Sequence, residues 1–509
     1  MEKLSIEDMA VFCKRKGFAY PNSEIYGGIA GFWDFGHLGV ELKNNIKREW
    51  WKFHVNDRED IVGMDGSIIT HPRVWEASGH VESFEDVMLT CSKCKERIRA
   101  DHFIEDKLKI SVEGLDSKEI DKLVNKNKLK CPKCGSSFED IKDFNLMFKT
   151  NVGPREDKTS VSYLRPETAQ LIFADFKLVV ENARLKLPFG IAQIGKAFRN
   201  EISPRDFLFR SREFEQMEIE YFVHPDQTDK CPYVKEVMSK ELNFYTEEMQ
   251  QKNKKPIRMK VKDALNKKLV SEWHAYWLAT EQKWFTDLGA NPDNFRIRQH
   301  LKKEKSHYAL DTWDLEYNFP FGWKELQGFS NRTDFDLKQH IKFSGKDLSI
   351  FDEETKKKIV PHVVAEPSLG VERAFLVFMF DAYTYDKKRG NVVLRLHPRL
   401  APMTVAVFPL VSNKPQIVKK AKEVRDGLKK YFNVFYDQGG SIGRRYARQD
   451  EIGTTLCITV DFDSVEGSDV TIRERDTTKQ VRVKIKDICH KIWEYMEGAQ
   501  FEKLGKKIR

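Results

Sequence analysis

An amphipathic stretch near the N-terminus gives the first clear pattern of apolar and polar positions. In GHLGVELKNNIKREWWKF, apolar side chains recur at Leu38, Leu42, Ile46, Trp50 and Phe53, at spacings of four, four, four and three residues. This period places the five side chains on one face of a helix, whose usual role is packing against a core. The segment that follows, DIVGMDGSIITHP, has the pattern of a short strand stopped by its final proline.

Two later segments also have the alternation of strands. SREFEQMEIEYFV alternates apolar side chains with acids, which predicts a strand with one polar face. HVVAEPSLGVERAFLVFMFDAY predicts a strand end near Glu366, a turn at Gly370 and an apolar helix with Arg373 in its first turn. Residues 225–300 are charged and aromatic without a clear chemical motif, and we interpret them as a helical insertion of unassigned role.

The pattern of apolar and polar residues changes after Leu396. MTVAVFPLV has the pattern of a buried strand, KKAKEVRDGLKKY that of a helix, and CITVDFD that of another strand, which together predict a separate α/β domain. The chain carries a net charge of +9, and residues 396–509 hold 22 Lys and Arg against 15 Asp and Glu. Such an excess favours a nucleic-acid partner, although a basic solvated surface explains the charge equally well.

The length of 509 residues predicts three or four folding units. The longest apolar run, Ala374 to Phe380, is far shorter than the ~20 residues of a membrane span. The first residues, MEKLSIEDMAVFCKRKG, mix both charge signs and lack a long apolar core, so neither a secretory signal nor a transit peptide is visible. We therefore expect a cytoplasmic protein without a membrane partner.

Four of the eight cysteines form two CxxC pairs, Cys91 with Cys94 and Cys131 with Cys134. Two thiolates on a tight turn can bind one side of a metal, and four soft sulfur ligands favour tetrahedral Zn²⁺. A [4Fe–4S] cluster and four unliganded thiols are the alternatives. Since four thiolates leave no open coordination position, the metal should be structural.

A second chemical motif lies in FRNEISPRDFLFRSREFEQME. Arg199 and Glu201 are two residues apart, so on a strand both would point to one face. A turn at residues 203–206 would return the chain antiparallel through Arg210, Arg212 and Phe214. Guanidinium groups suit phosphate oxygens and a ring can stack on a purine, whereas a cross-strand ion pair is the structural alternative.

This hairpin resembles motif 2 of the class II aminoacyl-tRNA synthetases, residues 368–373 resemble motif 3, and the amphipathic helix with its following strand resembles motif 1, the usual dimer element. The segments YLRPETAQ, FRNEISPRD, REFEQMEIEYF, ELQG, EPSLGVER and GSIGRRYARQDEIGT together are similar to the homodimeric glycyl-tRNA synthetases. Motif 3 of the class usually opens with glycine, where this chain has Ser368, as expected within the glycyl type. The resemblance runs from about residue 18 to residue 487.

The resemblance implies an α+β fold: an antiparallel sheet with flanking helices, a zinc-binding insertion and a C-terminal α/β anticodon-binding domain. It places the catalytic part with motif 1 at 1–86, a zinc-ribbon-like insertion at 87–143 and motif 2 in 144–224. The helical insertion would occupy 225–300, the part with motif 3 would occupy 301–395, and the anticodon-binding domain would occupy 396–509.

The resemblance also implies roles for individual residues. Arg199, Glu201 and Arg373 would be catalytic. The ATP site would comprise Arg199, Asn200, Glu201, Phe209, Arg210, Arg212, Phe214, Glu325, Leu326, Gly370 and Arg373, with Glu325 as the ligand of the Mg²⁺ that accompanies ATP. The glycine site would comprise Arg99, Glu167, Phe214, Glu215, Gln216, Met217, Glu218, Glu366, Ser368 and Gly370.

The implied reaction is the attachment of glycine to the 3′ end of tRNA(Gly) through a glycyl-adenylate, carried out by a homodimer. Acids such as Glu167, Glu218 and Glu366 can hold the α-ammonium of glycine and leave no room for a Cβ, which excludes larger amino acids. The alternatives are a related enzyme with another amino-acid specificity and a nucleic-acid-binding accessory protein that has lost catalysis. An accessory protein of this descent would be expected to lack the ATP-binding arginines, which are present here.

The basic C-terminal domain contains the segment GSIGRRYARQD, which we interpret as a loop. Arg444, Arg445 and Arg448 in such a loop could reach an RNA backbone or splayed bases. The alternative is that they pair with nearby acids such as Asp450 and Glu451.

Overall fold

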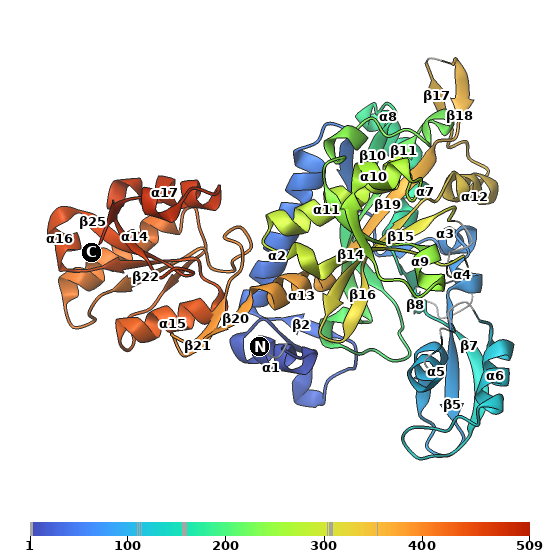
Figure 1. Ribbon diagram of the computed structural model, residues 1–509, viewed down its shortest axis with the longest axis horizontal. Helices are drawn as coiled ribbons and strands as arrows, with labels where there is room; N and C mark the ends of the chain where they lie inside the picture. The colour runs from blue at the N-terminus through green and yellow to red at the C-terminus, as the bar shows by residue number, and fades with distance from the viewer. Residues whose placement is uncertain are drawn as a thin grey trace.

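The computed structural model describes residues 4–508 except 109, 111, 113–114, 155–159, 303, 305–308 and 354. Figure 1 shows a large central body, a small unit formed by α5, α6, β5 and β7 at its lower right, and a C-terminal unit on the left. Within the described part of the chain, none of the helices is long and apolar enough to cross a membrane.

The central body is built on a nine-stranded sheet in the order β13-β12-β14-β15-β16-β19-β11-β10-β3. Most neighbours are antiparallel, while β3 with β10 and β12 with β14 are parallel. The strands are β3 (Ile61–Met64), β10 (Phe189–Phe198), β11 (Glu213–Val223), β12 (Glu241–Tyr245), β13 (Ile257–Lys260), β14 (Phe295–Gln299), β15 (Thr312–Phe319), β16 (Gly322–Ser330) and β19 (His362–Gly370).

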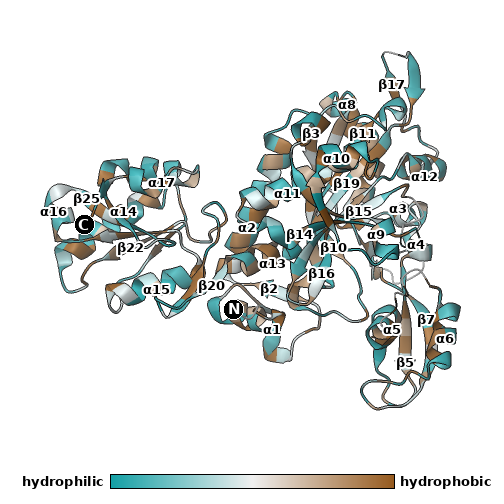
Figure 2. Cartoon of the chain, in the orientation of Figure 1, coloured by the Kyte–Doolittle hydropathy of each residue, from teal (hydrophilic) through white to brown (hydrophobic). Residues whose placement is uncertain are grey.

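One face of this sheet is covered by α11 (Glu272–Asp287) and α13 (Val371–Ala382). Helix α2 (His37–Trp51) packs on α13, and α1 (Ile6–Lys16) contributes to the same core. The predicted face of α2 is buried, with Leu38 2% exposed and Leu42, Ile46 and Trp50 fully covered. Helix α13 is apolar around nearly its whole circumference (Figure 2) because it lies between α2 and β11.

The opposite face carries α7 (Ala169–Ala174), α8 (Phe176–Ala183) and α12 (Phe335–Ser344) near the β3 end of the sheet. Phe173, Phe176, Phe189 and Phe222 form the centre of a second core there. Short elements complete the body: β1 (Ala19–Pro21), β2 (Trp33–Phe35), β4 (Ile69–Thr70), α3 (Pro72–Ala77), α4 (His80–Ser83), β8 (Phe148–Asn151), β9 (Val161–Leu164), β17 (Ile350–Asp352) and β18 (Lys357–Ile359).

The prediction of a helical insertion over 225–300 is wrong in part. Besides α9 (Glu247–Gln251), α10 (Val261–Asn266) and α11, this range contains β12, β13 and β14, which extend the central sheet. These strands have only four or five residues, so their alternation is too short to stand out among the surrounding charges. The tryptophans of α11, Trp273, Trp277 and Trp284, are buried in the main core.

Residues 85–145 form a separate small unit. Strands β5 (Glu85–Cys91), β6 (Arg97–Arg99) and β7 (Phe138–Asn145) make an antiparallel sheet that packs on α5 (Ala100–Leu108) and α6 (Ser117–Lys126). Its own core includes Leu89, Phe103, Ile104 and Ile120.

The C-terminal unit contains a six-stranded sheet in the order β23-β22-β24-β25-β26-β27, parallel across β23, β22 and β24 and antiparallel beyond. The elements are β22 (Val405–Pro409), α14 (Pro415–Leu428), β23 (Val434–Tyr436), α15 (Ile442–Ile452), β24 (Leu456–Val460), α16 (Phe462–Gly467), β25 (Asp469–Glu474), β26 (Gln480–Lys484), α17 (Ile488–Met496) and β27 (Lys506–Lys507). A hairpin of β20 (Tyr383–Asp386) and β21 (Asn391–Leu394) joins it to α13 and packs on α15.

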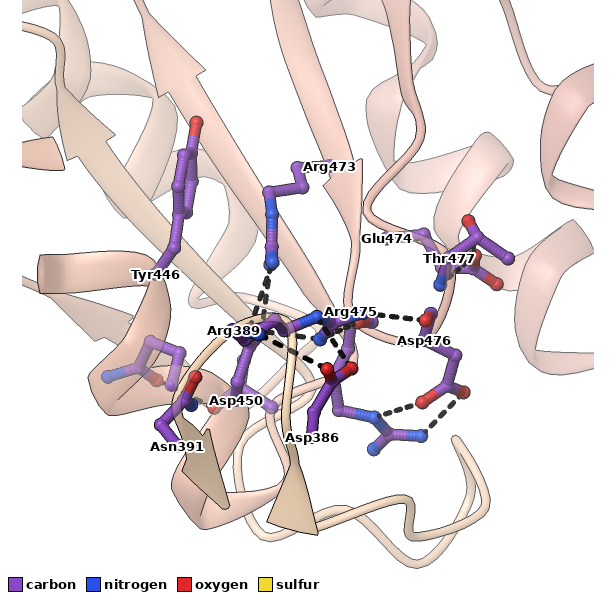
Figure 3. Close-up of polar contacts among 12 residues, drawn as sticks. Asp386, Arg389, Asn391, Tyr446, Asp450, Arg473, Glu474, Arg475, Asp476 and Thr477 are labelled. Atoms are coloured by element: carbon purple, nitrogen blue, oxygen red, sulfur yellow. Dashed lines mark hydrogen bonds and ion pairs between the residues drawn. The ribbon is translucent and has the colours of Figure 1, made fainter. Parts of the chain in front are cut away.

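An ion-pair network fixes this junction (Figure 3). Asp450 on α15 accepts two hydrogen bonds from Arg473, at 2.8 and 2.9 Å, and one from Arg389 of the hairpin at 3.2 Å. Arg475 is 2% exposed and donates to the backbone oxygen of Leu396 in the linker. Because these guanidinium groups bond to both units, the network holds the C-terminal unit against the hairpin.

Candidate active site

A cavity of about 800 Å³ opens on the sheet face opposite α13. Its walls come from the β10–β11 connection, β15, β16, the end of β19 and the first turn of α13. Of the residues singled out from the sequence, the cavity is lined by Arg199, Glu201, Phe209, Arg210, Phe214, Gln216, Glu325, Leu326, Ser368, Gly370 and Arg373.

The β10–β11 hairpin forms as predicted, with Phe198 opposite Glu213 and Ala197 opposite Phe214. The strand argument for Arg199 and Glu201 is wrong, because β10 ends at Phe198 and both residues lie in the connection. Arg199 Nε donates to the carbonyl oxygen of Pro166 at 3.1 Å, and its guanidinium lies 5.4 Å from the ring centre of Phe214. The connection thus places a cation and an aromatic ring together at the cavity wall.

Glu201 is 7% exposed and anchors the other arginines of the hairpin. Arg210 Nε donates to Glu201 Oε2 at 2.8 Å, and Arg99 Nη1 lies 3.8 Å from the same oxygen. His102 also contacts Arg210. Burial, opposed by Asp101 but reinforced by nearby arginines, lowers the pKa of His102 to about 3, so a neutral ring can accept a hydrogen bond from Arg210. Arg99 and His102 belong to the small cysteine-bearing unit, which therefore reaches the cavity.

On the opposite wall, Arg373 Nη1 lies 3.1 Å from Glu325 Oε1 and donates to the Glu325 carbonyl oxygen at 2.9 Å. Its guanidinium lies 4.6 Å from the ring centre of Phe209. The Glu325 side chain is half exposed, so desolvation raises its pKa only in part, and Arg373 and His300 outweigh this and lower the pKa. Asp314 is nearby: a Cβ added at Gly328 would lie 3.9 Å from Glu325 Oε1 and 4.0 Å from Asp314 Oδ1.

An acidic recess, defined here as Glu167, Glu218 and Glu366, adjoins the cavity below Gln216 and Ser368. All three carboxylates are at most 9% exposed. Gln216 Nε2 donates to Ser368 Oγ at 3.2 Å, and Glu218 pairs with Ser368 across β11 and β19. The predicted polar face of β11 is therefore buried, since it faces this recess rather than solvent.

One arginine neutralises part of this charge. Arg332 is 1% exposed and donates to Glu366 Oε1 at 2.7 Å and to Asp336 at 2.8 and 2.9 Å. Its Nη2 lies 3.7 Å from Glu167 Oε1. Burial raises the pKa of Glu167, but His80 and Arg332 outweigh burial and lower it below its ordinary range. The carboxyl groups of the recess outnumber Arg332, so a further cation could bind there and balance their charge.

Sequence reasoning missed Arg332, Asp336 and His80. The only sequence signal is the spacing of four between Arg332 and Asp336 at the start of α12, which is common in helices and points to no ligand. These residues approach Glu167 and Glu366 only in the folded protein, because they belong to segments more than thirty residues apart in the sequence. No local sequence pattern reveals such contacts.

Several predicted site residues do not line the cavity. Glu215 pairs with Lys43 and Lys47, at 3.3 and 2.9 Å, and Met217 is fully buried in the main core, because alternation turns both toward α2 and α13. The side chains of these two residues therefore point away from the cavity, and their part in the glycine site stays a prediction that only their backbone could fulfil. Arg212 bonds to the backbone oxygens of Glu201 and Ala30, while Asn200, Arg99, Glu167, Glu218 and Glu366 lie beside the cavity or beneath it.

The four cysteines of the CxxC pairs converge, and their four Sγ atoms all lie within 4.8 Å of one another. The Cys91 and Cys134 sulfurs are 3.4 Å apart, and those of Cys94 and Cys131 are 3.6 Å apart. Each CxxC forms a tight turn in which the residue after the second cysteine, Lys95 or Gly135, has positive φ and its N–H donates to the carbonyl of the first. Tetrahedral Zn–S bonds of ~2.3 Å separate sulfurs by ~3.8 Å, so the set fits zinc.

The interpretation of GSIGRRYARQD as a loop is wrong. Ser441 caps α15, its Oγ accepting from the Arg444 N–H, and the three arginines lie on that helix. Arg445 is 2% exposed and donates to the carbonyl oxygens of Pro409 and Leu410. Arg444 and Arg448 are exposed. Asp450 bonds to Arg473 and Arg389, and Glu451 pairs with Lys16. Arg448 pairs instead with Asp437 at 2.7 Å, so the alternative of a nearby acidic partner holds for that residue.

Comparison with known proteins agrees with this geometry. Residues 148–382 match the tRNA synthetase class II core domain (G, H, P, S and T), and residues 404–495 match the anticodon binding domain. A prolyl-tRNA synthetase structure from Cryptosporidium parvum superposes with a TM-score of 0.56 at 16% identity, covering 97% of this chain and 77% of the other.

Core and anticodon-binding domains together define a class II aminoacyl-tRNA synthetase. The chain is 46% identical to the glycine–tRNA ligase of Caldanaerobacter subterraneus subsp. tengcongensis, over 96% of this chain and 97% of the relative. It is 44% identical to the glycine–tRNA ligase of Thermobifida fusca, over 97% of this chain and 99% of the relative. The chain belongs to the glycine–tRNA ligase family.

Proposed function

We propose that this protein activates glycine with ATP and transfers the glycyl group to the 3′ end of tRNA(Gly). The observation that carries the proposal is the acidic recess beside an arginine-lined cavity. The recess can hold an α-ammonium group, and the cavity can hold a nucleotide. Glu167, Glu218 and Glu366 would bind the ammonium closely enough to exclude a Cβ, with Ser368 and Gln216 between the recess and the cavity.

In the first step, a carboxylate oxygen of glycine attacks the α-phosphorus of ATP and pyrophosphate leaves. Glycine needs no general base, because its carboxylate is ionised at neutral pH. Arg199 would bind the α-phosphate and Arg373 the γ-phosphate, while Phe214 stacks on adenine. In the second step, a terminal hydroxyl of the tRNA attacks the glycyl carbonyl and AMP leaves. Catalysis therefore rests on positioning and charge stabilisation.

The ATP of this reaction is expected to carry Mg²⁺. Glu325 and Asp314 converge beside Gly328, which has no side chain, so two carboxylates can supply the oxygen ligands that Mg²⁺ prefers. When bound there, the ion would neutralise phosphate charge.

The test of the proposed function is ATP–pyrophosphate exchange with each amino acid in turn. Among the amino acids tested, glycine alone should support exchange above the rate measured without any amino acid. Exchange driven by alanine or serine as well as by glycine would contradict the assignment of the recess. Homodimeric assembly, a cytoplasmic location and the domain boundaries stay predictions of the sequence.

We also propose that Cys91, Cys94, Cys131 and Cys134 hold one structural Zn²⁺. Protein purified under reducing, zinc-replete conditions should contain about one zinc per chain by elemental analysis. Replacing Cys94 and Cys131 together by serine should abolish the metal, whereas the same change at Cys231 and Cys489 should not. Wild-type protein without metal would contradict this proposal.

The C-terminal unit is proposed to bind the anticodon limb through the exposed arginines of α15. Arg444→Gln with Arg448→Gln should raise the apparent KM for tRNA and lower the salt dependence of binding by about one unit of slope per lost phosphate contact. Exchange without tRNA should stay at the wild-type rate, because the active site lies in the central body.

The matched control is Arg445→Gln, which lies on the same helix but is buried. It should lower the melting temperature without a specific loss of salt dependence, because its donors stabilise the backbone of Pro409 and Leu410. A double variant whose exchange falls as much as its aminoacylation would refute the proposed division of labour.

A further inference from the structure

Glu220 lies next to the acidic recess but outside the roles described so far. It follows Glu218 on the same face of β11 and is fully buried. Within the described part of the chain, neither of its carboxylate oxygens has a hydrogen-bond donor. The strand register, with Glu218 opposite Ser368 and Tyr221 opposite Ala365, places Glu220 opposite Glu366 of β19.

The immediate polar neighbours of Glu220 are other carboxylates. Glu218, Glu220 and Glu366 each place an oxygen within 4.8 Å of the other two. Ionised carboxylates are acceptors only, so three buried anions at this separation cannot hydrogen-bond to one another. A proton on one of them removes a charge and supplies the missing donor.

The position of that proton follows from the existing donors. Glu366 accepts from Arg332 at 2.7 Å, and Glu218 accepts from the hydroxyl of Thr168. Burial raises the pKa of all three acids, but these donors favour the charged forms of Glu366 and Glu218, whereas Glu220 receives no donor. On the far side, β10 places Ile191 opposite Glu220, which offers neither a charge nor a donor.

We propose that Glu220 is a protonated carboxylic acid that donates a hydrogen bond to Glu366 and so positions Glu366 for the ammonium group of glycine. This inference rests on the proposed function for the identity of the ammonium ligand. Glu220 is a positioning residue, because it would act on the substrate only through Glu366.

The charged groups that face Glu220 support this assignment. Burial raises its pKa, and Glu366 of β19, Glu218 of β11 and Asp336 of α12 raise it further. Arg332 opposes them, but the net pKa lies well above the ordinary value. An acid with a raised folded pKa keeps its proton to a higher pH than an exposed glutamic acid does, and losing that proton would create a second anion beside Glu366.

The test compares Glu220→Gln with Glu220→Leu in glycine-dependent pyrophosphate exchange. The Gln amide keeps a donor but has no proton to lose, so its KM for glycine at neutral pH should stay within about threefold of wild type. Its KM should also rise less than that of wild type as the pH is raised. Leu keeps the bulk without the donor, and its KM should rise by about tenfold or more with a smaller change in kcat.

Infrared difference spectra of wild type minus Glu220→Gln report the proton independently of activity. A carbonyl band of a protonated carboxylic acid should appear at neutral pH. Absence of that band, an alkaline KM rise as steep in Glu220→Gln as in wild type, or equal KM values for the Gln and Leu variants would overturn the proposal. Wild-type protein without glycine-dependent exchange would instead refute the proposed function, while the band would still decide the protonation of Glu220.

Discussion

Replacing Arg199 by alanine is expected to lower glycine-dependent pyrophosphate exchange by about 10²–10³. The side chain is held by Pro166 and lies beside the Phe214 ring at the cavity wall, where it can meet the α-phosphate as charge builds during attack. A donor fixed in position before the reaction needs no reorganisation, which is why its loss is costly. The measurement is the exchange rate at saturating ATP and glycine.

The melting temperature should change little in this variant, since the Arg199 side chain donates a hydrogen bond to one backbone oxygen, that of Pro166. Arg258→Ala is the matched control, because this arginine is half exposed on β13 and pairs with Asp293 at 2.8 Å away from the cavity. It should leave exchange unchanged. An Arg199→Ala rate within about threefold of wild type would remove the proposed phosphate role.

Long regular patterns in the sequence predicted the elements that frame the site. Helix α2 is 15 residues long, so its amphipathic repeat occurs several times. Strand β11 is eleven residues long, so its alternation is repeated in the same way. The start of α13 was also predictable, because the apolar run from Ala374 begins one turn after Gly370. Antiparallel pairing of β10 and β11 then followed from the turn predicted at residues 203–206, although the actual connection extends over residues 199–212.

The chemical state of the site could not be predicted from the same patterns. Alternating acids on β11 have the pattern of a solvated face, and only the tertiary fold shows that Glu218 and Glu220 are buried. Alternation did separate the two faces of this strand, and it places the side chains of Glu215 and Met217 on the face away from the cavity, although the resemblance implies both residues for the glycine site. Their side chains point to α2 and the main core.

The C-terminal arginines illustrate a local failure. Two glycines before Ser441 suggested a loop, but the serine caps a helix whose period buries Arg445 and exposes Arg444 and Arg448. An N-cap serine followed by a helical spacing of polar residues was present in the sequence. The glycine signal outweighed it, because a short amphipathic period with few apolar residues resembles a loop.

Arg332→Met is expected to abolish measurable glycine activation and to destabilise the fold by about 3–5 kcal/mol. Met keeps much of the side-chain volume but removes the charge, leaving Glu167, Asp336 and Glu366 buried without their shared cation. The measurements are the KM for glycine in exchange and the free energy of unfolding in urea. Arg58→Met is the control, since Arg58 pairs with Asp60 at 2.8 Å outside the site. It should lower stability without changing the KM for glycine.

The pH dependence separates a lost cation from lost packing. Burial raises the pKa of Glu366 well above its ordinary value, and Arg332 opposes that rise, so the pKa of Glu366 should rise further without Arg332. Acids with raised folded pKa values bind more protons in the folded than in the unfolded state, so the free energy of unfolding rises as the pH falls. The gap in stability between Arg332→Met and wild type should therefore shrink as the pH is lowered from neutral. A packing defect would leave that gap constant, and a constant gap would show that Arg332 does not act through its charge.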